Sequence, residues 1–168
     1  MDHRPTILSL TKMHEQGLSL FRDAGELRFA SGTSPEILQR EVVGADALVI
    51  RTGGVVDAPL LDKGDRLRVV GRHGVGYDAI DIEAATARGI QVVYTPGANT
   101  ESVTEHVFAF MIGLSKHFSK MMSELARGNY HARTSLKGRE IAGKTLGIIG
   151  FGRIGRRVGE VAHVAFGM

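Results

Sequence analysis

The sequence contains no cysteine and no tryptophan among its 168 residues, and only four residues are proline. Without cysteine, disulfides, thiolate nucleophiles and cysteine-ligated metals are excluded. No apolar run approaches the roughly 18 residues that a membrane-spanning helix requires. Residues 1–7 also lack the charged and then apolar pattern of a secretory signal. We therefore expect a cytoplasmic protein with no membrane partner.

Neither sign of charge dominates the chain, but the two signs are unevenly distributed. Lys and Arg number 21 and Asp and Glu 18, which gives a formal net charge of +3. Residues 127–168 hold 8 of the bases and 2 of the acids. Only Tyr130, Phe151 and Phe166 supply aromatic rings there, and no recognition helix or base-stacking motif accompanies them. We expect no nucleic-acid partner.

Short apolar runs alternate with helix-like segments over about the first 95 residues, a pattern typical of a parallel sheet covered by helices. The runs are 6–10, 27–30, 47–50, 67–70 and 90–94. Helix-boundary signals separate them: Ser34 before Pro35, Asp57 two residues before Pro59, and Asp81 and Gly89 around a further helix. The pattern predicts a flavodoxin-like α/β domain.

Two other classes of protein share this strand count. A signalling receiver needs acidic residues after its first strand and a phosphorylatable Asp after its third. The residues found there begin with Thr11 and Arg51 instead. A flavin mononucleotide site needs a hydroxyl-rich phosphate loop after the first strand, and residues 11–14 do not provide one. Both classes are disfavoured.

From Ser102 onward the spacing of apolar residues becomes helical. The stripe consists of Val107, Met111, Leu114, Phe118, Met121 and Leu125. It predicts one long helix with Ser102 and Glu105 as a capping box and Gly128 at its end. A polar connector without periodicity follows. The expected parts are a substrate domain at 1–100, an interdomain helix at 101–128, a linker at 129–143 and a nucleotide-binding start at 144–168.

Residues 145–168 carry a G-x-G-x-x-G motif between a predicted strand at 145–149 and a helix reaching Ala165. In this context the motif binds dinucleotides: Gly150 permits the turn, Gly152 admits the pyrophosphate, and Gly155 lets the helix pack on the strand. The acidic residue that would contact the ribose is expected about 20 positions later. No such position exists before Met168, so the sequence does not distinguish NAD from NADP. Because the predicted strand also has no neighbours, we expect the chain to be a fragment.

Three segments together resemble the D-2-hydroxyacid dehydrogenases, the family that includes phosphoglycerate dehydrogenase, glyoxylate/hydroxypyruvate reductases and formate dehydrogenase. They are Gly71-Arg-His-Gly-Val-Gly-Tyr-Asp78, Asn99-Thr-Glu-Ser-Val-Thr-Glu-His106 and Gly143-Lys-Thr-Leu-Gly-Ile-Ile-Gly-Phe-Gly-Arg-Ile-Gly155. The resemblance covers essentially the whole chain. It implies hydride exchange between a nicotinamide cofactor and a small 2-hydroxy or 2-keto acid.

The resemblance also assigns roles to individual residues. Without the resemblance, the segment 71–78 could be either an anion-binding turn or a purely structural turn. Asn99 would be interpreted as a helix-entry residue. By resemblance, Val75 and Gly76 bind the substrate carboxylate and Asn99 lies beside the substrate. The cofactor would be contacted by Val75, Thr104, Gly150, Gly152, Arg153, Ile154 and Gly155. Arg51 and Arg72 are candidates for attracting the anionic substrate.

No residue of this chain is predicted to be catalytic. None of the seven histidines matches the family's catalytic histidine, and none has companions for a metal site. The family's Arg, Glu and His fall beyond Met168, so we expect the chain to be inactive alone and prone to aggregation, and the full-length protein to be a homodimer. A phosphoglycerate dehydrogenase-like activity is favoured. A glyoxylate or hydroxypyruvate reductase and a non-catalytic NAD-binding corepressor remain alternatives.

Overall fold

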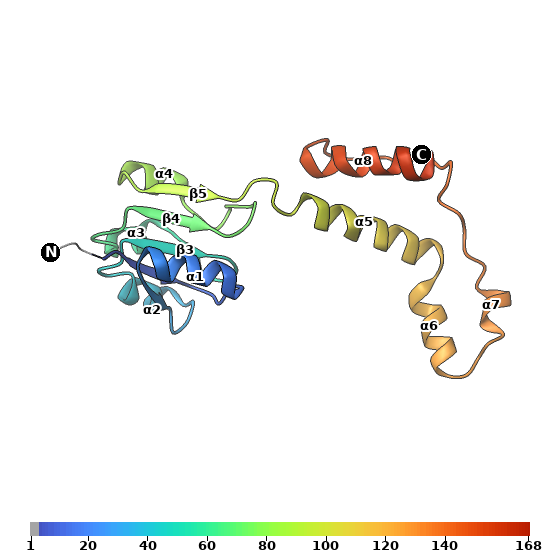
Figure 1. Ribbon diagram of the computed structural model, residues 1–168, viewed down its shortest axis with the longest axis horizontal. Helices are drawn as coiled ribbons and strands as arrows, with labels where there is room; N and C mark the ends of the chain where they lie inside the picture. The colour runs from blue at the N-terminus through green and yellow to red at the C-terminus, as the bar shows by residue number, and fades with distance from the viewer. Residues whose placement is uncertain (1–3) are drawn as a thin grey trace. The chain divides into compact units, whose positions relative to one another are not determined.

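A computed structural model describes residues 4–168, whose helices and strands are drawn in Figure 1. The chain divides into two compact units, Met1–Pro96 and Gly97–Met168. Each unit has its own cluster of buried apolar side chains. None of the described helices is both long enough and apolar enough to cross a membrane.

The first unit contains a five-stranded parallel sheet. Its strands are β1 (Thr6–Ser9), β2 (Glu26–Phe29), β3 (Ala47–Ile50), β4 (Val69–Arg72) and β5 (Gln91–Tyr94). Their order in the sheet is β2-β1-β3-β4-β5, and every neighbouring pair is parallel. This is the flavodoxin-like order, so the predicted fold class is confirmed. Each of the five strands predicted for this unit is found within about two residues of its expected ends.

Four helices alternate with the strands: α1 (Glu15–Ala24), α2 (Pro35–Glu41), α3 (Ala58–Lys63) and α4 (Ile82–Ala87). The predicted starts of α2, α3 and α4 are confirmed. The carboxylates of Asp57 and Asp81 accept hydrogen bonds from amides in the first turns of α3 and α4, at 3.0 and 2.8 Å. Ser34 precedes α2 without such a bond, and Pro35 sets the first helical φ angle.

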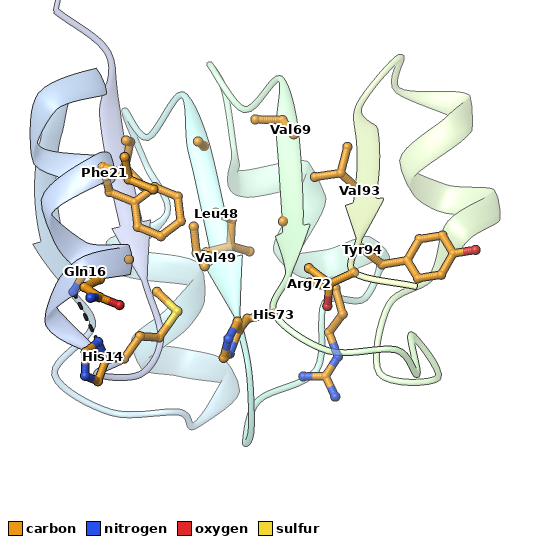
Figure 2. Close-up of a pocket in the computed structure, with 17 residues that line it drawn as sticks. His14, Gln16, Phe21, Leu48, Val49, Val69, Arg72, His73, Val93 and Tyr94 are labelled. Atoms are coloured by element: carbon orange, nitrogen blue, oxygen red, sulfur yellow. Dashed lines mark hydrogen bonds between the residues drawn. The ribbon is translucent and has the colours of Figure 1, made fainter. Parts of the chain in front are cut away.

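Alternate strand residues face opposite sides of the sheet. On one side Leu8, Leu48, Ile50 and Val70 are almost fully buried in the core formed with α2, α3 and α4. On the other side, α1 lies over the sheet and leaves a groove of about 540 Å³ beside it (Figure 2). The side chains lining the groove are mostly apolar, and Val93 is 53% exposed.

The second unit contains α5 (Thr100–Ser115), α6 (Phe118–Ala126), α7 (Ala132–Ser135) and α8 (Arg153–Phe166). The prediction of one continuous helix over 101–128 is therefore wrong. His117 takes a left-handed conformation with φ 55° and ends α5. The loop after α7 closes over that end, where the Arg139 amide donates to the Ser115 carbonyl at 2.8 Å. The Ser115 carbonyl at the end of α5 therefore has the Arg139 amide as its partner, and a helix that continued past this point would displace that amide.

Two smaller expectations are also corrected in this unit. Helix α5 begins at Thr100 with Asn99 as its N-cap, three residues before Ser102, so Ser102 and Glu105 do not form a capping box. Residues 145–149 do not form a strand, because in the described part of the second unit no other strand is present to pair with them. Ile149 is fully exposed as a result. The segment 129–143, expected to be a polar linker without periodicity, contains α7.

Helix α8 packs along α5 in the second unit. Phe108 of α5 and Val158 and Ala162 of α8 are the buried residues of this interface. At its surface the Arg157 guanidinium pairs with the Glu101 carboxylate at 2.9 Å. The helix ends at Gly167, which adopts the left-handed conformation with φ 62°. The packing fixes the start of α8 relative to the start of α5.

We predict that Glu41 makes the first unit sensitive to acid. The hydroxyl and amide of Ser31, together with Arg40, donate hydrogen bonds to this carboxylate and lower its pKa to about 2. A group with a depressed folded-state pKa contributes stability above its unfolded value, here the ordinary 4.5, and loses it as the pH falls toward 2. Urea unfolding between these two pH values should show a steeper loss of stability in the wild type than in Glu41→Gln. Equal slopes would contradict the assignment.

We also predict that the exposed sheet face promotes self-association. Light scattering should show that Val93→Lys reduces the aggregation of the wild type at little cost in stability, because the new charge stays in solvent. The matched variant Val70→Lys should fail to fold, because Val70 is completely buried. A monodisperse wild-type monomer would contradict the prediction.

Candidate functional site

The first candidate site is the turn that follows β4, at the carboxyl-terminal edge of the sheet. Two neighbouring segments hold it in place. The His73 amide donates to the Ile50 carbonyl at the end of β3, at 2.8 Å. After β5, Thr95 holds the turn through two hydrogen bonds. Its amide donates to the Gly74 carbonyl and its hydroxyl accepts from the Gly74 amide, both at 3.1 Å. The turn is therefore tied to the strands on both sides of it.

Within this turn, the amides of Val75, Gly76 and Tyr77 donate no hydrogen bond to any described residue. Gly76 and Tyr77 are exposed and Val75 is half-buried. Successive free N–H groups in a turn form a concave site for an anion. The ends of parallel strands are also where open α/β sheets bind their ligands. The geometry is thus suited to a carboxylate.

The groove on the α1 side of the sheet leads to the same edge. Figure 2 shows Val49, Val69 and Val93 along the sheet, with Arg72 and His73 near the ends of the strands. The apolar walls and the cationic end would suit a small molecule that carries a negative charge at one end. Arg51 lies exposed at the end of β3, the strand next to β4.

Two predicted site residues lie at the start of α5 and within it. Asn99 is the residue before the helix; it is exposed, and its side chain does not cap the helix. Its amide group therefore remains free of the role that helix-entry asparagines usually have. Thr104 is buried, and its hydroxyl donates to the Thr100 carbonyl at 2.8 Å. Only the lone pairs of that hydroxyl are left for a ligand.

The glycine-rich turn before α8 fits the pyrophosphate of a dinucleotide. Gly150 has a φ of 88°, which favours glycine. A Cβ on Gly152 would meet nothing within 4 Å, so this side of the backbone is open. A Cβ on Gly155 would lie 2.2 Å from the Gly150 carbonyl oxygen, so the helix can approach the turn only with glycine there. The start of α8 adds unpaired N–H groups and the positive end of its dipole.

The structure divides the predicted site residues between the two units. Val75 and Gly76 belong to the first unit. The second unit holds Asn99, Thr104, Gly150, Gly152, Arg153, Ile154 and Gly155. In the second unit, the loop before α5 lies near the start of α8, since a Cβ on Gly97 would be 3.9 Å from Arg153 Cδ. Arg153 is exposed, whereas Ile154 packs in the interface of α5 and α8.

Sequence reasoning missed Thr95 and the structural use of Arg72. The signal for Thr95 was a hydroxyl residue directly after a strand, at the edge where the candidate turn lies. Arg72 donates a hydrogen bond from Nε to the Gly76 carbonyl oxygen at 2.6 Å. Residues 4–168 contain no group of three acidic or histidine side chains that could hold a metal ion.

A parallel sheet with a turn suited to an anion, followed in sequence by a glycine-rich turn suited to a dinucleotide, is what we expect of a dehydrogenase. Residues 7–146 match the family described as D-isomer specific 2-hydroxyacid dehydrogenase, catalytic domain. The chain belongs to this family of oxidoreductases.

Its similarity to particular members is substantial. It is 41% identical over 162 residues to D-3-phosphoglycerate dehydrogenase from Methanocaldococcus jannaschii, covering 96% of this chain and 30% of that protein. Hydroxypyruvate reductase from Thermotoga maritima is 39% identical over 131 residues, covering 78% and 42%. The chain thus spans less than half the length of these two curated relatives.

Solved structures support the same family. The TT0316 protein from Thermus thermophilus is 30% identical with a TM-score of 0.89, over 97% of this chain and 54% of that one. D-lactate dehydrogenase from Aquifex aeolicus, solved with NAD and lactic acid, is 27% identical with a TM-score of 0.83, over 97% and 49%.

We predict that two glycine substitutions in the dinucleotide turn have different effects. Gly152→Ala should leave the free energy of unfolding within about 0.5 kcal/mol of the wild type, since its Cβ meets open space. It should nevertheless weaken NADH binding at least about tenfold, because the methyl group fills the space of the pyrophosphate. Gly155→Ala should cost about 1–3 kcal/mol through its clash with Gly150.

Chemical denaturation and NADH fluorescence measure the two effects. Unchanged NADH binding by Gly152→Ala would show that the cofactor does not use this turn.

Proposed function

We propose that the chain is the substrate-binding part of an NAD(P)-dependent dehydrogenase that acts on a D-2-hydroxy acid, with 3-phosphoglycerate as the favoured substrate. The observation that carries the proposal is the set of free amides at Val75, Gly76 and Tyr77, at the end of a central parallel strand. A substrate carboxylate would accept hydrogen bonds from these amides and be held in one orientation. Its neighbouring carbon would then present the C–H bond for reaction.

The cofactor of this proposal is NAD or NADP. When bound, the nicotinamide accepts or supplies the hydride. Within the second unit, the residues that would hold the dinucleotide are Gly150, Gly152 and the first amides of α8, with Thr104 as a further contact. The family relative from Aquifex aeolicus was solved with NAD, which supports the first choice. No residue here corresponds to the ribose contact that separates the two cofactors.

The proposed tasks of this chain are binding and orientation, without proton transfer. Val75 and Gly76 of the first unit would hold the carboxylate. The family's catalytic Arg, Glu and His have no counterparts among the 168 residues. We therefore propose that the chain alone is inactive and that the full-length protein is a homodimer. Detectable NADH oxidation with hydroxypyruvate by this chain would contradict the first part.

Two substrates are supported by relatives of nearly equal identity, a phosphoglycerate and hydroxypyruvate. They differ in the oxidation state of C2, and only the phosphoglycerate carries a phosphate on its C3 oxygen. Arg51 is suitably exposed for that phosphate at the same edge of the sheet as the turn. A guanidinium binds phosphate through strong, charge-assisted hydrogen bonds. Arg51 therefore favours the phosphorylated substrate, and hydroxypyruvate remains the second candidate.

Calorimetry with 3-phospho-D-glycerate and D-glycerate tests the proposed function. We expect the phosphorylated acid to bind at least about tenfold more tightly, which corresponds to about 1.4 kcal/mol. Arg51→Gln should remove this difference. Arg68→Gln, which removes the same charge before the opposite end of β4, should leave it unchanged.

Equal binding of both acids by the wild type would favour the hydroxypyruvate reductase alternative. Binding of neither acid would contradict the proposed carboxylate site.

A further inference from the structure

Arg72 is placed to control the shape of the carboxylate-binding turn. It is the last residue of β4, and the Nε–H of its half-buried side chain donates to the carbonyl of Gly76, four residues later. The distance of 2.6 Å is short for such a bond. The side chain therefore joins the start of the turn to the residue whose amide would bind the substrate.

The guanidinium also supports the middle of the turn. A Cβ on Gly74 would lie 3.3 Å from the guanidinium carbon and 3.4 Å from Nε and Nη2. Gly74 has a φ of 154°, a backbone conformation that side chains disfavour. The planar group therefore lies close to the Gly74 backbone, whose amide and carbonyl are also hydrogen-bonded to Thr95.

The bond to Gly76 determines the direction of a peptide plane. In a trans peptide, the C=O of one residue and the N–H of the next point in opposite directions. Fixing the Gly76 carbonyl toward Arg72 consequently fixes the Tyr77 N–H away from it. It also keeps a carbonyl oxygen, which would repel an anion, occupied by a donor. Gly76 has no side chain of its own to restrict its backbone, so the restriction has to come from a neighbour.

No carboxylate competes for Arg72, since no ion pair joins it to an acidic residue within 4–168. We propose that Arg72 is a positioning residue that holds the Val75–Tyr77 amides in their anion-binding arrangement. This inference rests on the proposed function, because that function makes the arrangement of the amides useful. The rigidity of the turn can be measured whether or not the proposed function is correct. Lysine could not replace Arg72, because an ammonium group lacks the planar fork that contacts Gly74 and Gly76 together.

The test uses the ¹⁵N-labelled chain of 168 residues and the variant Arg72→Lys, which keeps the charge. Backbone order parameters of Gly76 and Tyr77 should be near 0.85, the approximate value of rigid backbone, in the wild type and below about 0.6 in the variant. Binding of oxamate, measured by amide shifts in the turn, should weaken at least about tenfold. Arg68→Lys, the same substitution before the opposite end of the strand, should change neither quantity.

A second variant, Arg72→Gln, removes the charge as well as the planar fork, so comparing it with Arg72→Lys distinguishes a role of position from a role of charge. It also provides the test if the lysine variant does not fold. We expect it to loosen the turn as much as Arg72→Lys does. A turn that stays rigid in a folded Arg72 variant would overturn the inference. Weakening of oxamate binding in Arg72→Gln alone would overturn it too, because charge and not position would then matter. If the variants loosen the turn but oxamate shifts no amide even in the wild type, the positioning role stands and the proposed carboxylate site fails.

Discussion

Both candidate sites depend on backbone N–H groups that the fold leaves without a partner. Parallel strands all end at the same edge of a sheet, and the turn after β4 leaves three free amides there. The start of α8 leaves further free amides beside the glycine turn, as every helix start does. Negative groups bind such places without any charged side chain. The hydrogen bonds of Thr95 to Gly74 keep the first set of amides in place, and the packing of α8 on α5 keeps the second.

Much of this arrangement could be predicted because its signals are local. Apolar runs of four or five residues, with Asp57 and Asp81 as helix caps, indicate alternating strands and helices without knowledge of their contacts. The roles of the three motif glycines depend on close approach and on a positive φ angle, and glycine is the residue that permits both. These signals placed the five strands of the first unit within about two residues and identified the turn before α8.

The features that sequence reasoning missed depend on contacts between distant residues. The interruption at His117 requires the loop near Arg139 to close over the end of α5, although the apolar stripe continues across it. Residues 145–149 have the composition of a buried strand, but a strand forms only beside a neighbour. The bond from Arg72 to Gly76 is local in sequence, yet an arginine at a strand end is usually solvated, and no pattern marks this one as different.

We propose that two separate turns of this chain bind two different anionic groups. The most direct measurement is a map of amide chemical shifts in the ¹⁵N-labelled chain after addition of oxamate or of ADP-ribose, which carries the pyrophosphate but no nicotinamide. We predict that oxamate shifts the amides of 75–77 and that ADP-ribose shifts those of 150–156. Shifts from both ligands in the same turn, or in neither turn, would contradict the account.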